Sequence, residues 1–412
     1  MKILISSYWI LGNTGYGNQT FYLAKELLKY GHEIYLIAWD LLIKYSPVVK
    51  SLEVLYGPTL EGILKAHPEK KETCLKLKYL IPPEKPSPRK GHQPNLNKIL
   101  EPLIQNLKIE KLIMLHDIWP FKLESQFTIQ SFLWLPVHLS TLEKETIKNI
   151  KFINWIISPS QYGYQCLTPH HPKVYLIPHI IPFVTILENK KEIRSRILGF
   201  TKDSFLVTMV ARNSEENDRK AFKENLKGFT EFYKSLNSDE KNKIYLYLHT
   251  DWEGAIPINE LVKELPSKIL IKPDLVKYRA CLYSSSYIYS IYKASDLLLN
   301  VSCAEGFGIP LVEAQMMDCT VLTNHTTAMP ENNFFGYQVR GNTKDLNWER
   351  PNPKEIKEKL QIAFEDWNKE DSKEISEIKK IQKEIQKERI KNKFDPVTLG
   401  RQWNYLISFG HI

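Results

Sequence analysis

The feature that most constrains the fold of this chain is an alternation along its length. Short apolar runs that end in polar or glycine-containing turns are separated by segments of helical periodicity. Residues 2–7 (KILISS) form the first run, residues 21–30 form a helical segment with an apolar face, and residues 33–40 (EIYLIAWD) form the next run. Strands that alternate with helices pair in parallel, because a helical crossover returns the chain to the same edge of the sheet. The sequence therefore predicts an α/β fold.

The alternation occurs twice. The first series ends at residues 173–179 (KVYLIPH), a polar stretch follows at residues 188–196, and a second series begins at residues 204–210 (SFLVTMV). At 412 residues the chain is also longer than one ordinary core requires. We expect one α/β domain over residues 1–185 and a second over residues 186–395.

The positive net charge of the chain favours anionic partners. Lysine and arginine outnumber aspartate and glutamate by 56 to 47, and the net charge of +9 suits nucleic acid, anionic lipid or a phosphorylated small molecule. No nucleic-acid-binding motif is recognisable, so we expect no nucleic-acid partner. No apolar run approaches the roughly 20 residues of a membrane helix, and the amino terminus turns polar too early for a signal peptide. We expect a cytoplasmic protein and leave a peripheral membrane contact open.

Metal ligands show no recognisable pattern. The five cysteines are scattered, without a C-x-x-C pair or zinc-ligand spacing to histidine. The nearest approach to a D-x-D metal motif is Asp251-Trp252-Glu253, whose second acid is a glutamate. We therefore predict no metal and no cofactor. Any bound phosphate must then be neutralised by side-chain cations and helix dipoles.

Residues 304–314 (AEGFGIPLVEA) are the most informative stretch. Pro310 suits the first turn of a helix, so a helix should start at Ile309 or Pro310. The run DLLLNVS precedes it, which puts the helix N-terminus at the carboxyl edge of a parallel sheet, where such sheets bind ligands. Backbone N–H groups and the positive end of the helix dipole favour a phosphate there. The predicted phosphate-binding turn comprises Gly306, Phe307, Gly308 and Ile309.

Two glutamates flank this turn. Glu305 precedes it and Glu313 lies one helical turn after the helix start. A carboxylate accepts two hydrogen bonds side by side, which matches a sugar diol. We predict that Glu313 holds the ribose of a nucleotide and that Glu305 holds the hydroxyls of a sugar beyond the phosphates. Either residue alone would be an ordinary surface or helix-start glutamate.

The segment EGFGIPLVEA resembles the E-x7-E motif of retaining glycosyltransferases of the GT-B fold, family 4. Weaker matches are YKASDLLLNVS before it, TTAMPE after it, VARN near residue 212 and TGYGNQT near the amino terminus. The resemblance implies two Rossmann-like domains facing each other across a cleft, with a last helix at about 396–412 that crosses back to the first. It implies transfer of a hexose-type sugar, with retention, from a UDP- or GDP-type donor to a glycan, lipid or protein acceptor.

Three cations are candidates for holding the donor diphosphate. Arg212 follows a strand-like run at its carboxyl end, and Arg219 and Lys220 come shortly after it. The resemblance assigns one arginine and one lysine to the diphosphate, usually with fewer residues between them. Arg212 is therefore one predicted partner, and the choice between Arg219 and Lys220 stays open.

A glycine-rich segment, GNTGYGNQT, lies between the first strand and the first predicted helix. Gly15 and Gly17 allow close backbone approach to a ligand, and the resemblance places them against the donor phosphates. The alternative is a dinucleotide fingerprint with Asp40 as the ribose-binding acid. Its glycine spacing differs from G-x-G-x-x-G, and it leaves Glu305 and Glu313 without a role.

Two histidines end strand-like runs. The resemblance implies that His116 contacts the transferred sugar, with Asp117 beside it, and that His138 lies on the acceptor side. The predicted catalytic residues are thus His116, Glu305, Arg212 and Lys220. Two alternatives remain: a catalytically silent sugar-nucleotide-binding module, and a sugar-nucleotide epimerase or phosphorylase of the same fold.

Overall fold

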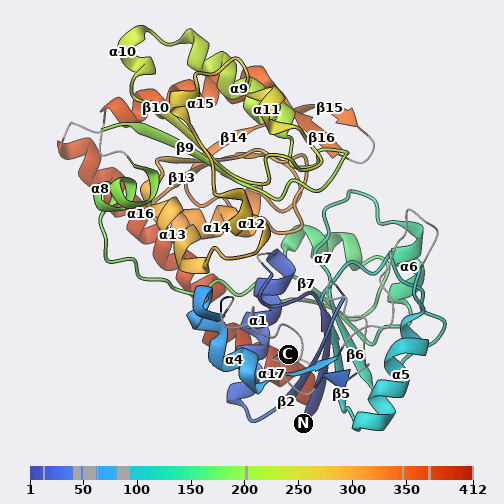
Figure 1. Cartoon of the computed structure of the whole chain (residues 1–412). Helices are drawn as coiled ribbons and strands as arrows, with labels where there is room; N and C mark the ends of the chain where they lie inside the picture. Colours follow the sequence, from blue (N-terminus) through green and yellow to red (C-terminus); the bar gives the residue numbers. More distant parts are fainter. Residues whose placement is uncertain are drawn as a thin grey trace. The chain divides into compact units, whose positions relative to one another are not determined.

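The computed structural model divides the chain into two compact units (Figure 1). Unit 1 comprises Met1–Val137, Thr141–Pro182 and Phe394–Ile412, and unit 2 comprises His138–Ser140 and Phe183–Lys393. Residues 183–185, expected in the first domain, thus belong to unit 2. The structure describes residues 1–12, 14–39, 48–49, 62, 64–80, 93–199, 203–345, 348–369 and 373–410, so Asp40 lies outside it.

Unit 1 is built on an eight-stranded sheet in the order β3-β4-β2-β1-β5-β6-β7-β8. All pairs are parallel except β3 with β4. The strands are β1 (Lys2–Ser7), β2 (Glu33–Ala38), β3 (Val48–Val49), β4 (Lys78–Leu80), β5 (Lys111–Met114), β6 (Gln130–Trp134), β7 (Trp155–Ser158) and β8 (Val174–Leu176). Its helices are α1 (Gly15–Lys29), α4 (Lys71–Lys76, after a 3-10 turn at Pro68–Lys70), α5 (Leu96–Leu107), α6 (Lys144–Ile150), α7 (Gln161–Leu167) and α17 (Pro396–Phe409).

Helix α1 begins earlier than the sequence analysis expected. Gly15 and Gly17 lie in its first turn, because the side chain of Thr14 accepts a hydrogen bond from the Gly17 N–H and caps the helix. A Cβ at residue 17 would lie 2.4 Å from the carbonyl oxygen of Trp9. Gly17 is therefore required by the packing of its own loop, whatever ligand it meets.

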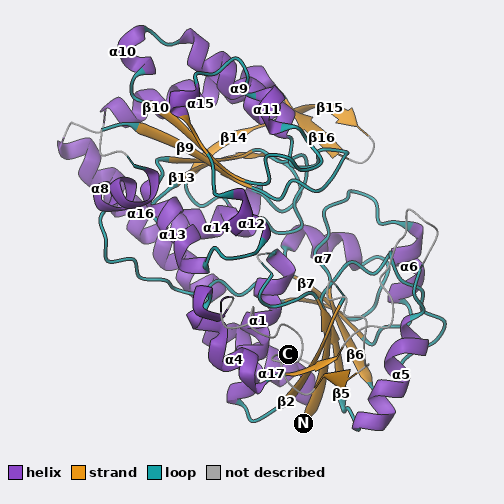
Figure 2. Ribbon diagram, viewed as in Figure 1, coloured by secondary structure: helices purple, strands orange, loops and turns teal. Residues whose placement is uncertain are grey.

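Unit 2 is built on a fully parallel sheet in the order β11-β10-β9-β12-β13-β14, and Figure 2 shows its strands among helices. These strands are β9 (Phe205–Val210), β10 (Ile244–His249), β11 (Leu270–Ile271), β12 (Leu297–Asn300), β13 (Thr320–Asn324) and β14 (Gly336–Val339). A separate antiparallel hairpin joins β15 (Gly341–Asp345) to β16 (Trp348–Pro351).

The helices of unit 2 cover both faces of its sheet. Alternate residues of β9 pack in opposite directions: Val207 lies in a core with α9 and α15, and Leu206 lies in another with α8 and α13. The α-helices are α8 (Lys190–Ile193, continued by a π-turn to Leu198), α9 (Phe222–Ser235), α10 (Ser238–Lys241), α11 (Ile258–Leu261), α12 (Leu275–Arg279), α13 (Ser285–Ala294), α14 (Ile309–Met316), α15 (Pro353–Asn368) and α16 (Lys373–Phe394). Short 3-10 turns occur at Ser267–Ile269 and Pro330–Asn332.

No helix in the described part of the chain combines the length and the apolar character that crossing a membrane needs.

The carboxyl-terminal helix α17 completes the core of unit 1. Leu399, Trp403, Leu406 and Ile407 are buried in the same core as β1 and α1. The rings of Trp403 and Trp134 meet edge to face, 5.1 Å apart, and a Cβ at Gly400 would lie 2.7 Å from that of Glu26 on α1. A segment more than 200 residues away in sequence from unit 1 is therefore part of its core.

We predict that Trp403→Ala lowers the free energy of unfolding of unit 1 by about 3 to 5 kcal/mol, because it leaves a large cavity in that core. Val397→Ala on the exposed side of α17 is the control and should change stability by less than about 0.5 kcal/mol. Denaturant unfolding with limited proteolysis of residues 1–180 provides the measurement. Equal stability of the two variants would contradict this role for α17.

Candidate functional site

The helix after residue 308 starts where the sequence analysis predicted. Helix α14 begins at Ile309, with Pro310 in its first turn, and no side chain caps its N-terminus. Gly308 precedes it at φ +85°, a left-handed conformation that costs a non-glycine residue about 1 kcal/mol or more. Strand β12 ends at Asn300, so the helix start lies at the carboxyl edge of the unit 2 sheet. This edge is a favourable position for an anion.

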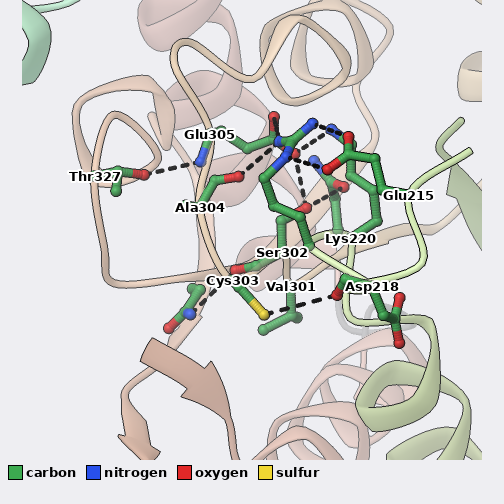
Figure 3. A network of polar contacts seen from close by, with 12 residues as sticks. Glu215, Asp218, Lys220, Val301, Ser302, Cys303, Ala304, Glu305 and Thr327 are labelled. Carbon is green, nitrogen blue, oxygen red and sulfur yellow. Dashed lines mark hydrogen bonds and ion pairs between the residues drawn. The ribbon is translucent and has the colours of Figure 1, made fainter. Parts of the chain in front are cut away.

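Glu305 is the centre of a polar network at this edge (Figure 3). One carboxylate oxygen accepts hydrogen bonds from Lys220 Nζ at 2.5 Å and from Ser302 Oγ at 2.7 Å, and the other lies 3.3 Å from Arg219 Nη1. The backbone N–H of Glu305 donates to Thr327 Oγ1 at 2.9 Å. The residue is only 7% exposed, so its conformation is fixed by these partners.

The charges in this network decide the ionisation of Glu305. Burial alone would raise the pKa of its carboxyl, but the positive charges of Lys220 and Arg219 and the hydrogen bonds from Lys220 and Ser302 lower it to about 2. Burial lowers the pKa of the Lys220 ammonium, and Glu305 opposes that effect. The pair therefore exists as carboxylate and ammonium at neutral pH.

Arg219 and Lys220 are both brought to Glu305, but they are held differently. Arg219 Nε and Nη2 donate to the Glu215 carboxylate at 3.0 and 2.6 Å, and Nη1 donates to the Ala304 carbonyl at 2.9 Å. The Lys220 ammonium has three N–H donors, and the one hydrogen bond that it donates within the described residues goes to Glu305. Lys220 is thus the better placed of the two to take a further acceptor.

The loop carrying these cations is fixed to the loop carrying Glu305. The Cys303 N–H donates to the Arg219 carbonyl at 2.8 Å, and Asn225 Nδ2 donates to the Val301 carbonyl at 3.0 Å. At the other end, Asn213 Nδ2 donates to the carbonyls of Asp251 and Ile256. The loop between Arg212 and Lys220 is thus held by hydrogen bonds near both of its ends.

Arg212 is not part of the Glu305 network. It follows β9, is exposed, and makes no hydrogen bond or ion pair with any residue that the structure describes. The structure therefore joins Lys220 and Arg219 to Glu305 but does not join Arg212 to them.

Glu313 has a different environment from Glu305. Tyr289 and Tyr292 of α13 donate to its two carboxylate oxygens at 3.5 and 3.3 Å. Burial raises the pKa of Glu313 to about 7, against the hydrogen bonds from Tyr292 and Tyr289, which lower it. No lysine or arginine among the described residues forms an ion pair with it. The two glutamates of one motif therefore have pKa values on opposite sides of the ordinary one.

Several solved structures resemble this chain, although no protein-family model and no curated protein sequence matches it. A glycosyltransferase from Rickettsia africae ESF-5 is 15% identical with a TM-score of 0.65, covering 99% of this chain and 97% of its own. Anabaena HepE, in complex with UDP and glucose, is 13% identical with a TM-score of 0.64, covering 99% of both chains. Sucrose-phosphate synthase from Thermosynechococcus elongatus is 13% identical with a TM-score of 0.66, covering 99% of this chain and 98% of its own.

At such low identities the likeness establishes the fold alone. The chain has the GT-B fold. Its two Rossmann-like units are the two parallel-sheet units described above.

His116, which the family resemblance placed against the transferred sugar, is part of the core of unit 1. His116 is fully buried, and both ring nitrogens are hydrogen-bonded: Nδ1 to the Asp117 carbonyl at 2.9 Å and Nε2 to Ser6 Oγ at 3.0 Å. A carbonyl can only accept, so Nδ1 carries the proton and Nε2 accepts from Ser6. Burial lowers the pKa of His116 to about 4, so the ring is neutral. Both ring nitrogens are therefore already hydrogen-bonded within unit 1, and the contact of His116 with the transferred sugar stays a prediction.

The structure shows where the remaining predicted residues lie, but it does not test their predicted roles in binding the donor or the acceptor. Asp117 accepts a hydrogen bond from Tyr16 Oη at 3.0 Å. Gly15 is exposed in the first turn of α1, and Gly17 is buried there. His138 lies in the three-residue segment that belongs to unit 2. Their contacts with donor or acceptor stay predictions.

The sequence analysis missed the residues that support the glutamates. Glu215, Ser302 and Thr327 hold Glu305 and its cations, and Tyr289 and Tyr292 hold Glu313. Glu215 and Arg219 lie in a loop, where the helical spacing rule for charge pairs does not apply, so their pairing leaves no signal in the sequence. Ser302 lies three residues before Glu305 in the same loop, and Thr327, Tyr289 and Tyr292 lie on separate elements.

Unit 2 also contains a cavity of about 480 Å³ that is separate from the Glu305 network. It is lined by the first residues of β9, β12, β13 and β14 and by parts of α15 and α16, so it is at the amino-terminal edge of the sheet. It contains none of the predicted site residues. Glu305 and its cations therefore lie at the opposite edge of the unit 2 sheet from this cavity.

We predict that Glu305→Gln destabilises unit 2 by about 3 kcal/mol at pH 7, because it leaves Lys220 without its counterion. Since the folded-state pKa of Glu305 lies below the ordinary value of 4.5, its ionisation stabilises the fold fully above pH 4.5, and this stabilisation is lost as the pH falls toward 2. The difference between wild type and variant should therefore shrink at pH 3.

Denaturant unfolding at the two pH values provides the measurement. Glu358→Gln, at an exposed glutamate on α15, is the control and should match wild type at both. A Glu305→Gln variant as stable as this control at pH 7 would contradict the network.

Proposed function

We propose that this chain is a retaining glycosyltransferase of family 4, which moves a hexose-type sugar from a nucleotide-diphosphate sugar to an acceptor hydroxyl. The observation that carries the proposal is the arrangement of Glu305 with Lys220 and Arg219 beside the uncapped start of α14, eight residues before Glu313. The likeness to a glycosyltransferase and to HepE with UDP and glucose supports the same reading. UDP and GDP are the donor types considered, and the acceptor is a glycan, lipid or protein.

In this proposal the donor diphosphate is neutralised by the protein itself. The N-terminus of α14 supplies about half a positive charge together with its backbone N–H groups. Lys220 has N–H donors beyond the one given to Glu305, and exposed Arg212 makes no hydrogen bond or ion pair with the described residues. Arg219 is largely occupied by Glu215 and Ala304, so we assign it to holding Glu305 in place.

The two glutamates then take different roles. Ionised Glu305 accepts hydrogen bonds from the hydroxyls of the transferred sugar, whose ring gains positive charge as its bond to phosphate breaks. Glu313 accepts the ribose hydroxyls, which change little in the reaction. The leaving diphosphate oxygen takes the proton from the acceptor hydroxyl. Catalysis is mainly electrostatic stabilisation of the departing diphosphate.

A thermal-shift screen followed by an activity assay tests this function. UDP-, GDP- and ADP-glucose are each added with EDTA; a donor at 100 times its Kd should stabilise the protein by about 2.7 kcal/mol. The donor that binds should then be hydrolysed slowly, or transferred to added acceptor, at the same rate in EDTA and in magnesium. We expect the anomeric configuration to be retained.

The outcomes separate the alternatives. Binding without turnover would favour the silent binding module, and an altered sugar on the intact nucleotide would favour the epimerase. Activity lost in EDTA and restored by magnesium or manganese would contradict the metal-independent neutralisation. No binding of any of the three donors would overturn the proposal.

We predict that Arg212→Ala weakens binding of the nucleoside diphosphate by about 1.5 to 3 kcal/mol, the usual size of a charge-assisted hydrogen bond. Thermal stability without ligand should change by less than about 0.5 kcal/mol, because exposed Arg212 makes no hydrogen bond or ion pair with the described residues. Binding of the bare nucleoside should also be unchanged. Calorimetry on this variant and on Lys227→Ala, at an exposed lysine of α9, makes the comparison. Equal diphosphate affinity in both variants would remove Arg212 from the site.

A further inference from the structure

Two tyrosines of α13 stand behind Glu313. Tyr289 and Tyr292 are three residues apart, so they lie on the same face of the helix. The Tyr289 hydroxyl lies 3.5 Å from Glu313 Oε1 and the Tyr292 hydroxyl 3.3 Å from Oε2. Both tyrosines are almost fully buried, at 1% and 0% exposure. Each carboxylate oxygen therefore has one hydroxyl donor within the protein.

The hydroxyls are the polar groups that stabilise the charged form of Glu313. Glu313 is half-buried with its carboxyl facing the tyrosines of α13, and no cation among the described residues forms an ion pair with it. Removal from water disfavours the carboxylate, and the hydrogen bonds from Tyr292 and Tyr289 favour it. Unlike Glu305, which is held by two charges, Glu313 depends on neutral donors.

We propose that Tyr289 and Tyr292 are positioning residues that hold Glu313 ionised and oriented for the ribose hydroxyls of the nucleotide donor. Each carboxylate oxygen has two lone pairs, so one can accept from a tyrosine and the other from a ribose hydroxyl. The tyrosines do not touch the donor themselves. This inference rests on the proposed function, because it gives Glu313 its ribose-binding role.

Proton linkage follows from this arrangement. A protonated carboxylic acid offers the ribose one fewer acceptor site and donates a proton instead, so the donor should prefer ionised Glu313. Donor affinity should then rise with pH up to the pKa of Glu313, which is about 7 in the ligand-free protein. Below that midpoint the affinity should fall as the pH falls, by at most about tenfold per pH unit.

Tyr292 and Cys319 lose their protons above this pH range. Tyrosine hydroxyls ordinarily lose their proton near pH 10, and burial raises the pKa of Tyr292 well above that. The thiol of Cys319 lies near Tyr292, and burial raises its pKa to about 12. A midpoint near pH 7 would therefore report Glu313.

Calorimetry between pH 5.5 and 8.5 tests the proposal. The probe is whichever of UDP-, GDP- and ADP-glucose binds the wild type; their phosphates stay ionised throughout this range. Tyr292→Phe removes one hydroxyl and keeps the ring, so the midpoint should move to higher pH and affinity at pH 6 should fall several-fold. Tyr289→Phe should move the midpoint the same way, and the double variant should move it further.

Two further variants complete the design. Glu313→Gln should bind the donor more weakly and without pH dependence between pH 5.5 and 8.5. Tyr233→Phe, at a buried tyrosine on α9 in the other core of unit 2, should leave the midpoint unchanged. The free protein's melting temperature is measured for every variant, so that a loss of fold is seen separately.

The results distinguish this inference from the function on which it rests. If the wild type binds none of the three donors, the proposed function fails. If the donor binds but the Tyr→Phe variants keep the wild-type midpoint, the function stands and the positioning role is wrong. Affinity reduced equally at every pH would assign the tyrosines to core packing alone, which also overturns the proposal.

Discussion

The carboxylate of Glu305 is the charge on which the candidate site depends. A buried carboxylate is costly unless it is paired, and Lys220, Arg219 and Ser302 together offset that cost. The two loops that supply these groups follow β9 and β12, which are neighbours in the sheet. Pairing the charges therefore also fixes the loops against each other, and backbone bonds from Cys303 and side-chain bonds from Asn225 reinforce the same contact.

One short motif places two glutamates in opposite electrostatic environments. Glu305 precedes α14 and meets cations from the β9–α9 loop, so the pKa of its carboxyl falls to about 2. Glu313 lies within α14 and, among the described residues, accepts hydrogen bonds from tyrosine hydroxyls of α13 and pairs with no cation, so burial raises its pKa to about 7. The difference arises from the element that packs behind each residue, since the chemistry of the two side chains is identical. Two carboxyls whose pKa values are shifted in opposite directions are suited to different tasks in one site.

Local rules predicted the backbone of the site but not every element around it. The start of α14 is confirmed because Pro310 and the positive φ of Gly308 act within a few residues. The predicted start of α1 was wrong. The helix begins at Gly15, because the Thr14 cap stabilises a first turn that contains two glycines, which by themselves disfavour a helix. His116 was correctly placed at the end of a strand, but its burial and its bonds to Ser6 and Asp117 depend on packing that its neighbours in sequence do not reveal.

The sequence by itself determined the α/β class, the parallel strand pairing and the turn that precedes α14, because neighbouring residues determine both the alternation and the turn chemistry. Only the tertiary structure decided which side chains meet. Lys220 and Glu305 are 85 residues apart, and Tyr292 and Glu313 are 21 apart on different helices. The same holds for α17 in the core of unit 1, which the family resemblance implied but periodicity did not reveal. Such pairs depend on the register and packing of whole elements, so their partners and pKa values follow from the folded chain and not from the spacing of residues along it.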